Sequence, residues 1–409
     1  MQRSIITMIL VICLAVPAYS LTVEEAVRQA LKFNPDLQAL RLEEGAAQGR
    51  LEKARLLLIH NPTIEGSLSK KDKPEEAGGG AFTNYGFKLS QEFEIAGQRG
   101  ARIRAAEKEI ASVQAGIRDR ERILISEVKD AFTRVLALKK KSGLAREIVR
   151  LKEDLLGFTR VKFEAGDVSG LDVNLAEVEL SKAKRELLLG DREYRESLLV
   201  FQGFLGSSPD RSLILQGDLP LEAPALPDRA ALKERAFFLR PDARANGLDV
   251  EKAEAALNLA KKESVPNVTL SGFYDRDELR NAIGLAVSIP IPLFDRKQAE
   301  KKEAYAKAEG AKIKYNGQKT TIEREVEQAA NDLLTAIEEL DLFKKEIIAK
   351  AAENLNLLNL AFKEGKIGFF EVRLAQKDTI EVQFAYIEAQ TRTQLALNAV
   401  EKTTGGALK

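Results

Sequence analysis

Side chains that can act as nucleophiles or bind soft metals are scarce in this 409-residue chain, which has one cysteine, one histidine and two methionines. Cys13 and both methionines lie within the first 20 residues, and His60 precedes Asn61-Pro62 at the expected end of a helix. Thiol catalysis, or a metal site made of thiolates or several histidines, needs residues that the rest of the sequence lacks. We therefore expect no metal site, no cofactor and no enzymatic activity, and we interpret His60 as a packing residue.

The first 20 residues have the pattern of a secretory signal peptide. Arg3 precedes an apolar run, Ile5 to Val16, and Pro17 to Ser20 supplies small residues at the spacing of a cleavage site. The run is too short for a transmembrane helix, which needs roughly 20 apolar residues. Because Ile12 rather than a small residue precedes Cys13, lipid attachment is disfavoured. We predict a signal peptide over residues 1–20 and a mature chain without cysteine or methionine.

The charge balance argues against nucleic acid as a partner. The 63 basic and 62 acidic residues nearly cancel, and removal of Arg3 makes the two counts equal. With 44% hydrophobic, 31% charged and only 6% aromatic residues, the composition is typical of a helix-rich, heavily solvated chain. A secreted chain of this size without disulfides needs a large buried surface or oligomerisation.

The chain matches itself at an offset of about 200 residues. Matching segments occur in the same order: Asn34-Pro35-Asp36 with Arg240-Pro241-Asp242, Asn61-Pro62-Thr63 with Asn267-Val268-Thr269, Phe163 to Val168 with Phe362 to Ile367, and Asp172-Val173 with Glu371-Val372. A stretch containing Pro220, Pro224 and Pro227 separates the halves. We predict a first repeat over residues 21–218, a linker over 219–228 and a second repeat over 229–409.

Each repeat has a helical pattern followed by two alternating, strand-like patterns. The first helix is expected over residues 23–59, with Thr22 as its cap and Glu25 three residues later. Strands are expected at 63–69, 87–95, 268–275 and 283–293. About ten residues is the length of a tilted strand across a bilayer. Two isolated hairpins would expose edges that lipid does not tolerate, so closure requires other copies of the chain. A soluble hairpin packed on helices is the alternative.

The helices after the strands are too long for an ordinary globular domain. Residues 99–163 would form roughly 95 Å of helix. The matching stretch, residues 296–362, has apolar residues at alternating steps of four and three, which predicts a coiled-coil seam. These are Val326, Ala330, Leu333, Ile337 and Leu340. Alone, this seam favours a solvated rod; with a signal peptide and amphipathic hairpins, it favours a periplasmic tube below a membrane barrel.

These features together resemble the TolC-type outer membrane efflux factors over essentially the whole mature chain. Leu21 to Ala26 with Asn34-Pro35-Asp36 resembles the start of family members, and Gln91 to Arg102 resembles the strand-to-helix join of the branch paired with heavy-metal pumps. The segments 163–173 and 362–372 are similar to turns joining paired helices. The resemblance implies a mainly α fold with a membrane β-barrel part. Three chains, with four strands each, would form a 12-stranded barrel and a periplasmic α-helical tunnel.

The resemblance also implies function and partners. The chain would be the passive outer-membrane exit duct of a tripartite efflux pump, joined through a periplasmic adaptor to an inner-membrane transporter of the RND type. Heavy-metal cations are the cargo that the branch suggests. A type I protein-secretion duct shares this architecture and is the alternative, followed by a structural periplasmic coiled-coil protein and, weakest, a secreted enzyme.

The family places its adaptor contacts and its narrow entrance at the turns of the helix pairs. Carried over by position, the entrance acids fall on Asp172 and Glu371, and Leu374 stands where some members have a further acid; a helix cap is the other interpretation of Asp172. The expected docking residues are Gly166, Val168, Ser169, Gly365, Ile367 and Gly368. The polar side chains expected to line the barrel lumen are Lys88, Ser90, Glu92 and Glu94.

Overall fold

The computed structural model describes residues 19–72, 78, 80–209, 213–219, 228–277, 280–343 and 347–407. The predicted signal peptide up to residue 18 and residues 220–227 of the predicted linker lie outside these ranges. Tyr19 and Ser20, the last two residues of the predicted signal peptide, belong to strand β1 (Tyr19–Leu21), which pairs in parallel with β4 (Leu213–Leu215). The predicted cleavage site and repeat boundaries stay predictions.

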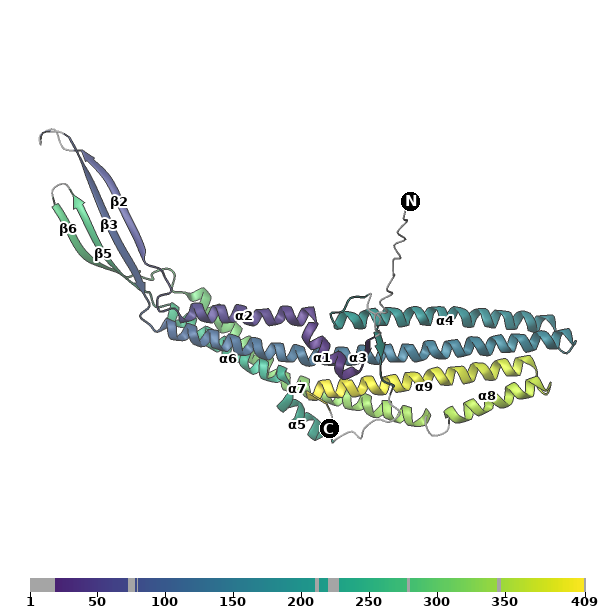
Figure 1. The fold of residues 1–409 in the computed structure, drawn as a ribbon. Helices are drawn as coiled ribbons and strands as arrows, with labels where there is room; N and C mark the ends of the chain where they lie inside the picture. The colour runs from purple at the N-terminus through teal and green to yellow at the C-terminus, as the bar shows by residue number, and fades with distance from the viewer. Residues whose placement is uncertain are drawn as a thin grey trace, which may run out of the picture. The chain divides into compact units, whose positions relative to one another are not determined.

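Long helices and strand hairpins follow one another in the same order in both halves of the chain (Figure 1). The first half contains α1 (Val23–Phe33), α2 (Pro35–Arg55), β2 (Thr63–Asp72), β3 (Ala81–Phe93), α3 (Gln98–Glu164) and α4 (Gly170–Phe204). The second contains α5 (Arg229–Leu239), α6 (Pro241–Glu263), β5 (Val268–Asp277), β6 (Arg280–Ser288), α7 (Gln298–Leu342), α8 (Ile348–Lys363) and α9 (Phe369–Thr404).

The chain divides into two compact units. The strand unit comprises Asp36–Arg122 and Lys233–Glu325, and the bundle unit comprises Met1–Pro35, Ile123–Leu232 and Val326–Lys409. In the described ranges, no helix is both long enough and apolar enough to cross a membrane.

The predicted single helix over residues 23–59 is wrong, since two helices, α1 and α2, occupy this stretch. The start is as expected: Thr22 Oγ1 accepts from the Glu25 N–H at 3.3 Å, and the Glu25 carboxylate accepts from the Thr22 N–H at 2.9 Å. Asn34 is extended because Pro35 disfavours helical geometry in the residue before it and has no N–H to donate. Proline then suits the first turn of α2.

The four strands of the strand unit form one antiparallel sheet in the order β2-β3-β5-β6, with β2 and β6 at its edges. The predicted return strand at 283–293 is shifted, because β6 covers Arg280–Ser288. Pro290 and Pro292 lack the backbone N–H that a ladder needs, so the strand ends before them.

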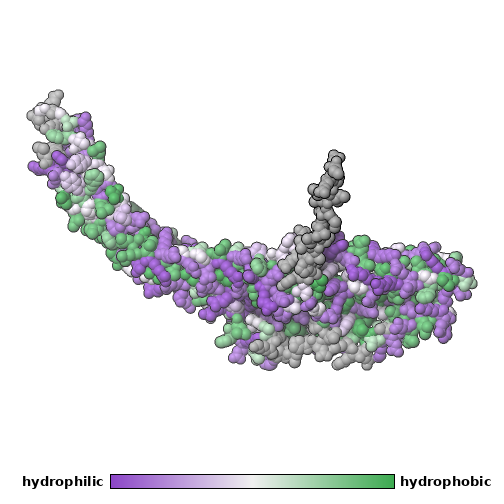
Figure 2. Space-filling view, viewed as in Figure 1, coloured by the Kyte–Doolittle hydropathy of each residue, from purple (hydrophilic) through white to green (hydrophobic). Residues whose placement is uncertain are grey.

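The two faces of this sheet differ in polarity. One face carries large apolar side chains that are strongly exposed, including Ile64 (77%), Ile283 (84%) and Leu285 (79%). Figure 2 shows hydrophobic residues among the strands. The other face carries Glu65, Ser67, Lys88, Ser90, Thr269, Ser271 and Ser288 at alternating positions. Such an exposed apolar face marks a surface that another apolar phase or protein covers.

Four helices of the strand unit contact one another in the series α2-α3-α6-α7, which matches the strand order β2-β3-β5-β6. Arg41 of α2 pairs with Glu121 of α3 at 2.6 Å, and Ser112 of α3 donates to Asp249 of α6 at 2.5 Å. Lys312 of α7 lies 3.2 Å from Glu254 of α6. These contacts link α2 to α3, α3 to α6 and α6 to α7, so α2 and α7 end the series as β2 and β6 end the sheet.

The expected continuous helix over residues 296–362 is also wrong, since α7 ends at Leu342 and α8 begins at Ile348. Phe343 and Ile347 have π-helical geometry, which is a wider turn that interrupts the α-helical pattern. The predicted seam lies in α7: Val326, Ala330, Leu333 and Leu340 are buried, and Ile337 is half-buried.

Candidate functional site

The turns joining α3 to α4 and α8 to α9 have the same backbone design. Gly166 and Gly365 have φ of +81° and +73°, which favours glycine. The N–H after each glycine donates to a carbonyl five residues earlier, at 2.8 Å: Asp167 to Lys162, and Lys366 to Ala361. This is the Schellman arrangement that ends helices. Both glycines, predicted as docking residues, therefore have a defined role in shaping the turns.

The two predicted gate acids occupy equivalent capping positions after these turns. The Asp172 carboxylate accepts from the Ser169 N–H at 3.0 Å and from its hydroxyl at 2.8 Å. The Glu371 carboxylate accepts from the Gly368 N–H. Because Gly368 has no side chain, only this half of a capping box forms in the second turn. Both acids thus cap a helix, as the alternative interpretation of Asp172 expects, and gating stays a prediction.

Apolar and basic side chains flank Glu371 on α9. Leu374 and Phe370 are 50% and 64% exposed. The Arg373 guanidinium lies over the Phe370 ring, 5.3 Å from its centroid, and 3.7 Å from the Glu179 carboxylate of α4. Arg373 therefore tethers α9 to α4, while Leu374 stays available for contact.

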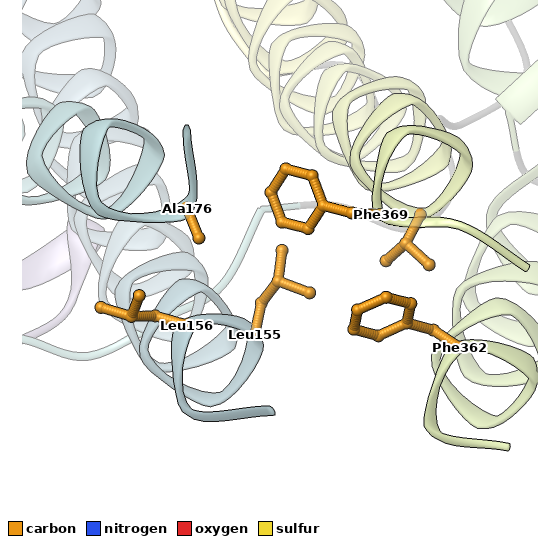
Figure 3. Packing of buried hydrophobic residues seen from close by; sticks show 6 residues of the cluster. Leu155, Leu156, Ala176, Phe362 and Phe369 are labelled. Atoms are coloured by element: carbon orange, nitrogen blue, oxygen red, sulfur yellow. The ribbon is translucent and has the colours of Figure 1, made fainter. Parts of the chain in front are cut away.

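A small apolar cluster holds the two helix pairs together behind the turns (Figure 3). It comprises Leu155, Leu156, Ala176, Phe362, Phe369 and Val372. The Phe362 and Phe369 rings meet edge to face, with centroids 6.4 Å apart. Ile367 is half-buried and packs against this cluster, and its predicted docking role stays a prediction. Of the other predicted docking residues, Val168 is half-buried and Gly166, Ser169, Gly365 and Gly368 are exposed.

A buried lysine beside this cluster was not among the predicted site residues. Lys152 of α3 is only 6% exposed and donates to the Gln376 side-chain oxygen of α9 at 2.9 Å. The Gln376 amide in turn donates to Asn359 of α8 at 3.2 Å. Burial lowers the pKa of Lys152; Glu179 opposes this and Arg373 adds to it. Lys152 looks like an ordinary polar helix residue in the sequence, so no local signal could have identified it.

Replacing Lys152 and Gln376 together, as Lys152→Met with Gln376→Leu, should stabilise the bundle unit. The pKa of Lys152 is lowered in the folded chain, so the charged form is disfavoured on folding; this cost is full below the folded pKa and disappears as the pH rises past the unfolded pKa. Apolar replacements of buried polar or charged groups can gain roughly 1–4 kcal/mol. The thermal midpoint of the helical circular dichroism signal should rise near neutral pH.

A surface pair provides the control for this prediction. Lys377 lies 3.7 Å from Glu381 and is 68% exposed, so Lys377→Met should change the midpoint little. A lower midpoint in the Lys152/Gln376 double variant would mean that the buried network stabilises the fold.

Three of the four predicted lumen residues lie on the polar sheet face. Lys88 Nζ is 3.2 Å from the Glu65 carboxylate, and the Ser90 hydroxyl is 2.9 Å from that of Ser271. The Glu92 carboxylate accepts from the Asn267 amide at 2.7 Å. Each polar side chain is thus satisfied by a neighbour, and the face is wettable without unpaired buried charge.

Glu94 is the exception, because it lies beyond the end of β3. It forms an ion pair with Arg102 of α3, and the two side chains are only 16% and 13% exposed. The alternation that predicted a lumen position stops where the strand stops, so Glu94 supports the strand-to-helix join instead.

His60 Nε2 lies 3.8 Å from Glu92, and the His60 side chain is 52% exposed. Within the described ranges, no group of three potential metal ligands lies together.

Known proteins share both sequence and fold with this chain. The sequence profile of the family described as outer membrane efflux protein matches residues 26–207 and 234–406. The cobalt-zinc-cadmium resistance protein CzcC of Cupriavidus metallidurans is 23% identical over 389 residues, covering 94% of this chain and 90% of CzcC. The pyoverdine export outer membrane protein OpmQ of Pseudomonas aeruginosa is 23% identical over 407 residues, covering 94% of this chain and 85% of OpmQ.

The fold is similar to that of CusC, whose crystal structures concern the conformational changes that accompany folding and transmembrane channel formation. The TM-score is 0.75 at 16% identity, and the match covers 94% of this chain and 92% of the CusC chain. This likeness confirms the predicted fold class, mainly α with two strand hairpins.

Proposed function

Because the chain belongs to the outer membrane efflux protein family, we propose that it is the exit duct of a tripartite pump, passive and without a catalytic step. Family membership confirms the predicted outer-membrane location and efflux function. In the proposal, three copies form the duct, a periplasmic adaptor contacts the turns after α3 and α8, and an RND-type inner-membrane transporter supplies the energy.

One observation supports the proposed contact between copies. The edge strands β2 and β6 adjoin α2 and α7, which are also the first and last helices of the series, and the number of copies, three, follows the family. β2 follows α2 directly, and β6 leads directly into α7. The edges β2 and β6 run antiparallel, as the three pairings within the sheet do. A copy that adds its β2 to a neighbour's β6 therefore also brings its α2 to the neighbour's α7. Where the rotation between neighbouring copies closes, repetition of this head-to-tail contact forms a ring and removes the open sheet edges.

The two sheet faces support this assignment. In a closed ring, the exposed apolar face would contact lipid and the polar face, with Lys88, Ser90 and Glu92, would line a water-filled passage. Heavy-metal cations are the cargo we favour, since CzcC is a cobalt-zinc-cadmium resistance protein. OpmQ exports pyoverdine, so small organic molecules are the second candidate. A type I protein-secretion duct differs in its transporter partner.

Cross-linking across the proposed ring contact tests the assembly. Leu42 of α2 and Ile313 of α7 are 76% and 72% exposed. Each lies about 20 Å along its helix from the end that adjoins the sheet, so the two should meet between neighbouring copies. With Leu42→Cys and Ile313→Cys in one chain, a short bis-maleimide should produce covalent trimers in outer-membrane fractions.

The single-cysteine variants are the matched controls. Because Cys13 lies in the predicted signal peptide, each single variant offers one thiol per mature chain and should stay monomeric on denaturing gels. Monomers alone from a membrane-inserted double variant would exclude this ring contact.

A further inference from the structure

Two glycines on the polar sheet face lie beneath side chains of the neighbouring strand β5. Gly284 of β6 is the direct partner of Phe273, and a Cβ on Gly284 would lie only 2.5 Å from the end of the Phe273 ring. Gly86 of β3 is the direct partner of Asp275, and a Cβ there would collide with the Asp275 carboxylate. Neither glycine has positive φ, so the backbone does not require glycine at these positions. Glycine is required instead because any Cβ would occupy the space of the overlying side chain.

The same arrangement extends across the sheet. Glu65, Lys88, Phe273 and Gly284 are paired in one row over β2, β3, β5 and β6. The Lys88 ammonium turns toward Glu65, and the Phe273 ring lies across Gly284 in the opposite direction. Strand side chains ordinarily stand roughly perpendicular to the sheet. In this row, the long side chains instead lie along the polar face, which keeps the space above it open.

We propose that Gly284 sets the width of the passage by allowing the Phe273 ring to lie flat, and that Gly86 does the same for Asp275. This inference rests on the proposed function, in which the polar face lines the passage. A methyl group on Gly284 removes the space that the ring occupies. Because the sheet backbone lies on one side, the ring must swing away from the sheet and into the passage. In a ring of three copies, three phenyl groups would narrow the bore at one level.

Access of thiol reagents to position 288 measures this effect. Ser288 is exposed on the same face of β6, four residues beyond Gly284 and roughly 13 Å closer to α7. A reagent entering from the β5–β6 turn must pass Phe273 before it reaches position 288. With Cys13 removed in the predicted signal peptide, Ser288→Cys provides the only thiol of the mature chain. Intact cells are treated with membrane-impermeant maleimides attached to polyethylene glycol chains of increasing length.

In the Ser288→Cys background, Gly284→Ala should slow labelling by the larger reagents several-fold and leave labelling by the smallest unchanged. Adding Phe273→Ala to Gly284→Ala should restore the rate, because the displaced ring is then absent. Gly66→Ala is the control: Gly66 lies on the apolar face, and a Cβ there meets nothing within 4 Å. If Gly284→Ala fails to assemble, Phe273→Trp should slow the larger reagents in its place, since an indole is too large for the space above glycine.

The outcomes separate this inference from the proposed function. Equal rates for large reagents in the parent, Gly284→Ala and Phe273→Trp variants would overturn the inference while leaving the duct in place. Absence of labelling by even the smallest reagent, in protein that has reached the outer membrane, would contradict the assignment of the polar face to the passage and both proposals with it.

Discussion

Replacing Glu371 with lysine should abolish or reverse the cation preference of the channel in planar bilayers. The proposed entrance repeats this carboxylate once per copy, and closely spaced like charges at a constriction set the sign of the ion that enters. Glu371→Lys reverses each of these charges. The reversal potential in a salt gradient measures the preference. The wild-type channel should conduct little if, as predicted, its entrance is closed without its partners.

The capping role of Glu371 requires a control that keeps the cap and removes only the charge. Glu371→Gln retains an oxygen that can accept from the Gly368 N–H, so its α9 start should be preserved while cation preference falls. Asp172→Asn is the matched change in the other turn, where the acceptor serves Ser169. If Glu371→Lys and Asp172→Lys channels both keep the wild-type reversal potential, these acids form no gate and Leu374 becomes the better candidate for the constriction.

Arginine at Gly166 or Gly365 should abolish export. Both positions have positive φ, where a side chain costs about 1–2 kcal/mol per residue, and both turns are exposed. A Cβ on Gly166 meets nothing within 4 Å, so a long side chain there projects from the turn into the space that an adaptor would occupy. On Gly365, the Cβ would lie 3.5 Å from the Lys162 ammonium, which repels a further cation. Export of the proposed heavy-metal cargo is measured as cellular resistance to cobalt, zinc and cadmium, beside adaptor co-purification.

Asparagine separates the backbone effect from the loss of docking. Asn tolerates positive φ better than most residues and has a short side chain, so Gly166→Asn should keep most export while Gly166→Arg loses it. Trimer yield should be the same in both variants. Wild-type resistance and adaptor binding in both arginine variants, at normal trimer yield, would show that docking uses another surface.

Local sequence signals predicted those elements whose energy depends on a few neighbouring residues. The Thr22 and Glu25 pair marked the start of α1, because a capping box involves only the first turn. Period-two alternation predicted the four strands and the side chains that share a face, because side-chain direction along a strand depends only on position. The strand ends were less accurate, since β3 covers Ala81–Phe93 rather than 87–95. The differences at Pro35 and at Pro290 are also local: a missing N–H ends the helix or the strand, although the periodic pattern continues past it.

Pairings across the chain were decided only by the tertiary structure. Lys152 meets Gln376 across more than 200 residues of sequence, and nothing near either residue distinguishes it from a solvated helix position. The sequence likewise placed Glu94 in the strand pattern, whereas its partner Arg102 lies in the helix that follows. Phe273 could be assigned to the polar face from alternation, but the glycine beneath it depends on the register between β5 and β6. Strand register and helix packing result from many weak contacts summed over distant segments. The sequence pattern therefore determines which face a side chain occupies. Which residue it contacts is determined only when the chain folds.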